Sequence, residues 1–194
     1  MKEDPSVHAW QTWGEERIAR ATLSGIVDPG SARLADMVAT HGAADVLAAL
    51  RASDQDSAWA RRSHCFTLVS AIGLLRHRVA RFLIPEDPDW PPGWTDLGTV
   101  HRDSMGGAPL GVWLVGEGSL AEAMVRAVTI VGSRACTPYG ERVATDVAAE
   151  LMEHDRTVIS GGAYGIDAAA HRGALVLSEA RRATTVAVLA RGLD

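Results

Sequence analysis

The sequence predicts an α/β protein in which a Rossmann-like parallel sheet, incomplete at its C-terminal end, follows a small all-helical domain. Two patterns lead to this expectation. Apolar residues recur at helical spacing through the first domain, whereas short apolar runs alternate with segments of helical length after residue 110. A proline-rich acidic segment, 85–109, separates the patterns and suits a connection better than regular structure. We therefore expect a helical domain at 1–82 and a Rossmann-like domain at 83–194.

Four stretches of the first domain carry the helical pattern, and no convincing strand is found among them. They are "WGEERIARATL" (13–23), "SARLADMVATHG" (31–42), "AADVLAALRAS" (43–53) and "SAWARRSHCFTLVSAIGLLRHRVARFL" (57–83). Ser31 is expected to cap the second helix, because it follows a Pro-Gly break and opens an apolar periodic stretch. In the connection, Trp90 and Trp94 are too large to leave in water, so this segment should pack on a domain surface.

Strands are expected at 111–118, 127–133, 157–162 and 184–191, and helices at 139–155 and 165–182 separate the last three. Strands that are apolar on both faces and alternate with helices specify a parallel sheet with helical cover. Ligands of such sheets bind beyond the carboxyl ends of the strands. At this edge the following helices present unpaired N–H groups and the positive ends of their dipoles.

Two glycine-containing turns fall at that edge of the predicted sheet. The first is "GSRACTPYG" (132–140) and the second is "SGGAYGID" (160–167). Glycines let the backbone approach an anion, hydroxyls add donors, and Arg134 can contact a phosphate in a bidentate manner or stack on a base. Together the turns describe an anion pocket. A simpler interpretation stays open, in which the glycines serve only tight strand-to-helix turns and Arg134 pairs with a surface carboxylate.

Several enzyme and cofactor classes are excluded or disfavoured by the same residues. Lys2 is the only lysine, so no nucleotide-hydrolysing P-loop can exist here. The turns do not follow the dinucleotide-binding pattern, and no zinc-protease or serine-hydrolase motif is present. We therefore expect no cofactor, no metal and no catalytic constellation. Asp167 and His171 share a helix face at i and i+4; they could support acid–base chemistry, or be a helix-start carboxylate and a bonded histidine.

Composition indicates a protein of the cytoplasm. The two cysteines, Cys65 and Cys136, form neither a C-x-x-C pair nor a Cys/His cluster, which favours a reducing compartment. No apolar leader or membrane span is expected. The net charge of −5 would ordinarily argue against a nucleic-acid binder, although basic residues concentrate locally along the chain.

Three ordered segments resemble the DNA-processing protein A family (DprA, also called Smf). They are "VTIVGSRACTPYGERVATDVAAEL", "TVISGGAYGIDAAAHRGAL" and "TVAVLARGLD", and "FLIPEDPDWPPGWTDL" resembles the family's entry to its Rossmann-like domain. The helical N-terminus resembles the family's sterile-alpha-motif-like or helix-hairpin-helix-like domain. The resemblance implies a non-enzymatic protein that binds single-stranded DNA and forms homodimers. It also implies that the protein protects incoming DNA strands and loads the RecA recombinase onto them during natural transformation.

The resemblance also implies a set of DNA-binding residues in the two turns. They are Gly132, Ser133, Arg134, Thr137, Tyr139 and Gly140 in the first, and Ser160, Gly161, Gly162, Ala163, Tyr164, Gly165, Ile166, Asp167 and His171 in or after the second. Tyr164 departs from the family's pattern, because many members place Arg there; one cation is lost and an aromatic face is gained. The chain ends at Asp194 within the third segment, so the family's C-terminal part, with its surfaces for dimerisation and RecA, is expected to be missing.

A second function stays open on the sequence alone. Nucleotide-binding enzymes of the same broad fold include nucleoside-monophosphate phosphoribohydrolases that resemble the cytokinin-activating "lonely guy" proteins. Their P-G-G-x-G-T motif with a nearby glutamate is not found here. Release of adenine from AMP would distinguish that enzyme from a DNA-binding protein.

Overall fold

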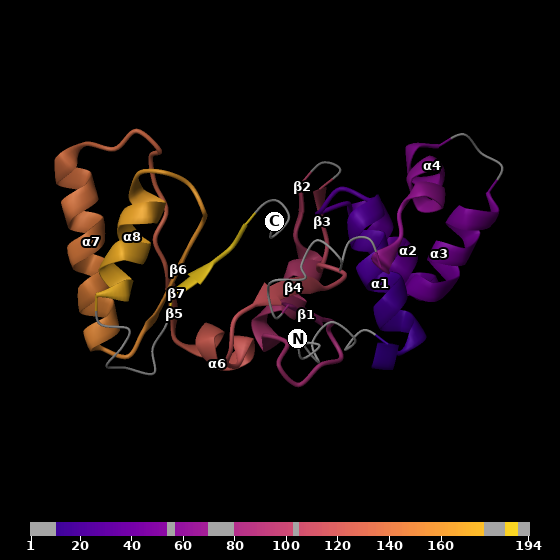
Figure 1. Cartoon of the computed structure of the whole chain (residues 1–194), viewed down its shortest axis with the longest axis horizontal. Helices are drawn as coiled ribbons and strands as arrows, with labels where there is room; N and C mark the ends of the chain where they lie inside the picture. The colour runs from indigo at the N-terminus through magenta and orange to yellow at the C-terminus, as the bar shows by residue number, and fades with distance from the viewer. Residues whose placement is uncertain (1–10, 54–56, 70–79, 103–104, 177–184, 190–194) are drawn as a thin grey trace, which may run out of the picture. The chain divides into compact units, whose positions relative to one another are not determined.

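The structure is a computed structural model that describes residues 11–53, 57–69, 80–102, 105–176 and 185–189 (Figure 1). It divides into two compact units, Met1–Gly118 and Ser119–Gly192. The elements of the first unit are α1 (Glu15–Ile26), α2 (Ala32–His41), α3 (Ala43–Ala52), α4 (Ala58–Cys65), β1 (Ala80–Leu83), η2 (Pro92–Thr99), β2 (His101–Arg102), β3 (Met105–Gly106) and β4 (Val112–Val115). Those of the second are α6 (Leu120–Val125), β5 (Ala127–Thr129), α7 (Pro138–Glu153), β6 (Thr157–Ser160), α8 (Ile166–Leu175) and β7 (Thr185–Ala187).

The helices of the first unit enclose an apolar core, as their periodicity predicts. Leu23 and Ile26 of α1 are fully buried against Val38 of α2 and Val46 of α3. The predicted cap is confirmed, because the Ser31 hydroxyl oxygen accepts the backbone N–H of Leu34 at 3.3 Å. Local sequence therefore specifies both the apolar face and the beginning of α2.

Helix α3 is capped by a side chain from another helix. It follows Gly42, which has no side chain to offer, and Glu16 of α1 accepts the backbone N–H groups of Ala43 at 3.0 Å and Ala44 at 3.3 Å. Partial burial alone raises the pKa of the Glu16 carboxyl. The hydrogen bonds from Ala43 and Arg20 outweigh that effect and hold the pKa below its ordinary value. This contact joins α1 to the positive end of the α3 dipole.

The prediction of a helix at 57–83 is wrong at the C-terminal end of that segment. Helix α4 ends at Cys65, and residues 80–83 form strand β1, which pairs antiparallel with β4. The strand expected at 111–118 exists as β4, but its partner is β1 and not the parallel sheet. Phe82 of β1 packs against Trp113 of β4 with ring centroids 4.8 Å apart, and this aromatic contact helps to explain the pairing. Residues 70–79 lie outside the described part of the chain.

The connection expected at 85–109 contains more regular structure than predicted. It forms the 3₁₀ helix η2 and the short antiparallel pair of β2 and β3. Trp90 is buried and meets Trp94 edge to face at 5.2 Å between centroids, which confirms that this segment is packed. The compact units divide after Gly118, at a different point from the boundary expected between residues 82 and 83.

The second unit contains the predicted parallel sheet, with strand order β5-β6-β7. Helices α7 and α8 lie side by side on the same side of these strands (Figure 1). Between them and β6 lies a core of small and flexible side chains: Ala148, Met152, Val158, Ala170 and Ala174. The helices approach closely at Gly173, where an added Cβ would lie 2.2 Å from the carbonyl oxygen of Thr145. Within the described residues, we find no helix with the length and apolarity that a bilayer crossing needs.

Candidate functional site

The two predicted turns lie in contact at the carboxyl ends of β5 and β6. The backbone N–H of Ile166 donates to the carbonyl oxygen of Ser133 at 3.2 Å. Gly165 has φ of 81°, and a Cβ added to it would lie 2.3 Å from the Ser133 oxygen and 2.6 Å from the Arg134 oxygen. Only glycine suits this position, because it combines a left-handed conformation with direct backbone contact. The backbone of each turn therefore supports the other.

Ile166 also fills the space between the glycines of the first turn. A Cβ added to Gly132 would lie 2.7 Å from the Ile166 side chain, and one added to Gly140 would lie 3.6 Å from it. Gly132 thus provides room for a neighbouring side chain. Ile166, which the sequence placed in the DNA-binding set, lies at the packed base of the site.

The first turn is held by its own hydroxyl groups. The Ser133 oxygen accepts the backbone N–H of Ala135 at 3.2 Å, and the Thr137 oxygen accepts that of Gly140 at 3.2 Å, which caps α7. Pro138 occupies the first turn of the helix, where a missing N–H costs nothing. Both hydroxyls act as acceptors in these bonds and retain their own O–H donors for another partner.

Three large side chains of the turns extend into solvent. Arg134 is exposed, Tyr139 is 78% exposed and Tyr164 is 87% exposed. Arg134 forms no ion pair with any residue that the structure describes, whereas Arg172 of α8 pairs with Glu141 of α7. A guanidinium and two aromatic rings are thus the accessible chemistry at this edge of the sheet.

Other predicted site residues lie beneath the turns and have internal partners. Ser160 is 2% exposed, and its hydroxyl donates to the carbonyl oxygen of Ile130 at 2.6 Å, which links β6 to the end of β5. Asp167 is also buried and accepts the backbone N–H of Ala163 at 3.4 Å within the second turn. These two side chains stabilise the turns from inside.

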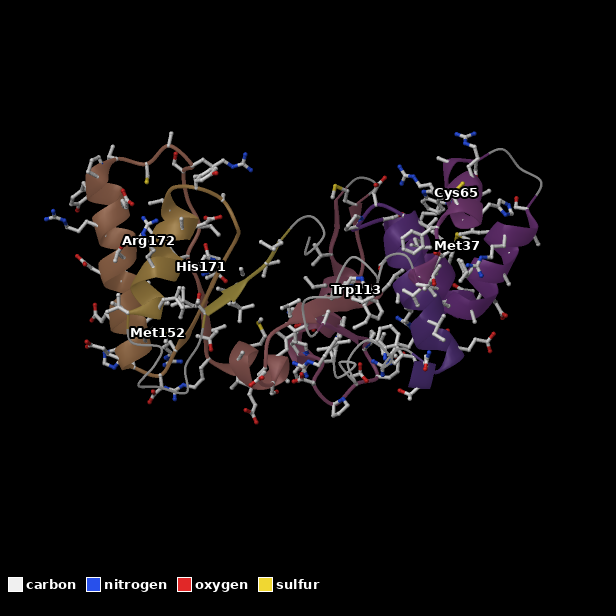
Figure 2. The ribbon with its side chains drawn as sticks, in the orientation of Figure 1. Met37, Cys65, Trp113, Met152, His171 and Arg172 are labelled. Atoms are coloured by element: carbon white, nitrogen blue, oxygen red, sulfur yellow. The ribbon has the colours of Figure 1, made fainter. Side chains whose placement is uncertain are left out.

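His171 connects the second turn with β7. Its Nδ1 lies 2.7 Å from the Thr185 hydroxyl, and its Nε2 donates to the Gly161 carbonyl oxygen at 2.9 Å. Figure 2 shows His171 on the side of α8 that faces the strands and Arg172 on the side toward α7. The interpretation as a bonded histidine is therefore the one that the contacts support. The described residues include no cluster that could hold a metal ion.

Sequence reasoning missed the contribution of the third strand. A Cβ added to Gly162 would lie 2.5 Å from Leu189, and one added to Gly161 would lie 4.0 Å from the Val188 carbonyl oxygen. Thr185 holds His171, as described above. The strand pattern at 184–191 already placed this chain end at the same edge as the two turns, and that signal could have identified the contacts.

A protein-family model described as DNA recombination-mediator protein A matches residues 81–194. The chain belongs to this DprA family. The match begins near the domain boundary expected from the sequence and not at the division between the compact units, so the assignment of 83–194 as one domain stays a prediction.

Curated proteins named DprA or Smf match the chain over different lengths. A DNA processing protein DprA of Mycobacterium tuberculosis is 37% identical over 199 residues, covering 98% of this chain and 47% of that protein. Protein Smf of Synechocystis is 34% identical over 125 residues, covering 59% of this chain and 26% of that protein. The chain thus spans about half the length, or less, of these relatives.

The fold class is confirmed by a solved structure, the X-ray structure of DNA processing protein A from Streptococcus pneumoniae. It superposes with a TM-score of 0.58 and 23% sequence identity, covering 94% of this chain and 59% of that chain. At this identity the likeness concerns the fold. Together with the parallel order β5-β6-β7, it places the chain in the Rossmann-like α/β class.

Proposed function

We propose that this chain binds single-stranded DNA at the two turns, 132–140 and 160–167, and that it does so without catalysing a reaction. One observation carries the proposal: the turns touch through Gly165, Ser133 and Arg134, at the edge of a parallel sheet where such folds bind ligands, and Arg134 is exposed there. Membership of the DprA family supports a polynucleotide as the ligand.

Single-stranded DNA suits the chemistry of these turns. A strand can be held by a few contacts to its phosphates together with stacking of its bases, and neither needs a reactive group. Ser133 and Thr137 retain hydroxyl donors for phosphate oxygens, and Arg134 offers a bidentate contact. The proposed set of DNA-binding residues is the one that the sequence predicts, with Ser160, Ile166, Asp167 and His171 acting through the backbone that they position.

The test is equilibrium binding of fluorescent oligothymidylate, followed by anisotropy at several salt concentrations. Arg134→Ala should weaken binding and reduce the slope of log K against log salt by about 0.7, because one phosphate contact on a single strand is lost. Arg126→Ala is the matched control. Arg126 is also exposed but precedes β5, at the opposite end of the strand. Equal affinity and an unchanged slope for Arg134→Ala would overturn the proposal, as would release of adenine from AMP.

We further propose that the protein acts in the cytoplasm as a homodimer. In this role it protects incoming DNA and loads RecA onto it during natural transformation. The DNA processing name of the Mycobacterium tuberculosis relative supports this role. These properties are proposed for the whole protein, because this chain spans about half the length of that relative. Sedimentation of the chain with oligothymidylate would test dimerisation, and RecA filament formation on that DNA in the presence of the chain would test loading. A chain that stays monomeric and has no effect on RecA would contradict the proposed wider role.

A further inference from the structure

Tyr164 is the most exposed of the large apolar side chains that the structure describes. The residue is 87% exposed, and no ring contact with another described aromatic residue involves it. The residue stands between Gly162 and Gly165 in a turn that continues directly into α8. A tyrosine ring left in water does not gain the burial that usually stabilises an aromatic side chain, and its face stays open to a ligand.

The backbone that carries this ring is fixed by the neighbouring turn. Gly165, the next residue, lies against the carbonyl oxygens of Ser133 and Arg134, and Ile166 donates to the first of these. Tyr164 is therefore attached to a backbone segment that directly contacts the one carrying Arg134. Both side chains extend into solvent from these adjoining segments.

The two turns themselves carry little positive charge with which to hold a phosphate backbone. Among the described residues of the two turns, Arg134 is the only cation, and the nearby Arg172 is paired with Glu141. One phosphate contact gives a modest, salt-sensitive contribution. An aromatic platform adds a contribution from base stacking that tolerates any sequence and needs no charge.

We propose that Tyr164 stacks on an unpaired nucleobase while Arg134 contacts the adjacent phosphate. This inference rests on the proposed function and deepens it, because it names the group that the site recognises. A base in a duplex has both faces covered by its neighbours and cannot present one to the ring. Tyr164 thus makes the site select unpaired bases, where an arginine would add another phosphate contact.

The first test uses the fact that the chain has two tyrosines, Tyr139 and Tyr164. Selective ring labelling gives two sets of NMR signals, which Tyr139→Phe and Tyr164→Phe assign. On titration with oligothymidylate the Tyr164 signals should move upfield, as expected for a ring beneath a base. An abasic oligomer of equal length, which keeps the phosphates, should not cause this shift. The Tyr139 signals are followed in the same spectra, because Tyr139 is similarly exposed and belongs to the proposed DNA-binding set.

The second test is affinity. Tyr164→Leu should weaken binding of oligothymidylate roughly tenfold and leave binding of the abasic oligomer unchanged, because only stacking is lost. Val125→Ala, at an exposed position of α6 outside the proposed DNA-binding set, should change neither. Tyr164→Arg should recover affinity with a steeper salt dependence, since it exchanges stacking for a phosphate contact. The exposure of Tyr164 makes these variants safe for folding, and a thermal melt of each checks it.

The outcomes separate the inference from the function on which it rests. If oligothymidylate binds and Arg134→Ala weakens it, but Tyr164→Leu has no effect, stacking by Tyr164 is overturned and the proposed function stands. Equal affinity of the native chain for oligothymidylate and the abasic oligomer overturns stacking in the same way. If oligothymidylate does not bind at all, the proposed function and the inference fail together.

Discussion

The backbone N–H of Ile166 donates to the carbonyl oxygen of Ser133 at 3.2 Å, so the first residue of α8 is tied to the turn that follows β5. This bond and the contact of Gly165 beside it join two loops that lie about thirty residues apart in the chain. The arrangement of the site therefore depends on backbone geometry at a few positions, and substitutions there test it directly.

Gly165→Ala should destabilise the second unit by about 1–3 kcal/mol, because the new Cβ meets backbone oxygens at a position with positive φ. Urea denaturation measures the change. Gly162→Ala is the matched control: its Cβ would meet only the end of the flexible Leu189 side chain. We expect a smaller effect there. Similar effects at both positions would contradict the backbone contact between the turns.

Gly173→Ala should destabilise the protein by about 1–3 kcal/mol, since the added methyl group meets the backbone of Thr145 on α7. In Gly140→Ala, the new Cβ has only ordinary contacts, and the better helix propensity of alanine should stabilise α7 by up to about 1 kcal/mol. We therefore expect Gly173→Ala to lower the melting temperature and Gly140→Ala to raise it. A stabilising Gly173→Ala would show that α7 and α8 do not approach so closely.

His171 and Thr185 should be energetically coupled, because the histidine ring joins the Thr185 hydroxyl to the Gly161 carbonyl. A double-mutant cycle with His171→Leu and Thr185→Val, measured by urea denaturation, should give an interaction energy of about 0.5–3 kcal/mol. Thr40→Val, in α2 of the other unit, should be additive with His171→Leu. If the changes in unfolding free energy are additive in both cycles, His171 does not connect β7 to the second turn.

Asp87 should make the first unit sensitive to acid. The hydrogen bond from Arg17 is the main cause that holds the pKa of the Asp87 carboxyl below its ordinary value, against the opposing effect of burial. A depressed pKa stabilises the fold above the unfolded-state pKa of about 4, and that contribution is lost as the pH falls through the folded-state pKa. Asp87→Asn should cost about 1–3 kcal/mol at pH 7, where a charge-assisted bond is lost.

The pH series for this prediction compares unfolding free energies between pH 7 and pH 2. The difference between the native chain and Asp87→Asn should shrink as the pH falls below about 4, because the unfolded chain then binds a proton that the folded carboxylate, with its lower pKa, accepts only at still lower pH. Glu86→Gln is the control. Its carboxylate is 59% exposed and lies 3.4 Å from Arg20, so little change is expected at any pH. A constant difference across the pH range would contradict the role of Asp87.

The parallel sheet could be predicted from sequence because its signals are local. The apolar runs at 127–133, 157–162 and 184–191 each contain one strand of the sheet, and helices separate them. The meeting of the two turns follows from that topology, since the carboxyl ends of neighbouring parallel strands share an edge. The predicted cap at Ser31 is local in the same sense.

Strand β1 could not be predicted in this way. Its residues, 80–83, continue the apolar spacing of the preceding helical pattern, and what makes them a strand is a partner about thirty residues later in β4. The internal roles of Ser160 and His171 are likewise decided by partners outside their own segment, Ile130 and Thr185. Sequence spacing placed both residues near the site but could not distinguish a ligand contact from an internal support.

The pairing of β1 with β4 has a consequence for anyone who expresses part of this chain. A recombinant fragment that begins at residue 83 would lose most of β1, leaving the backbone donors and acceptors of β4 open and Trp113 without Phe82. Open strand edges of this kind recruit other chains, so we expect such a fragment to aggregate. A fragment that begins at Ser119 contains no member of this pair and should be the better choice for crystallisation.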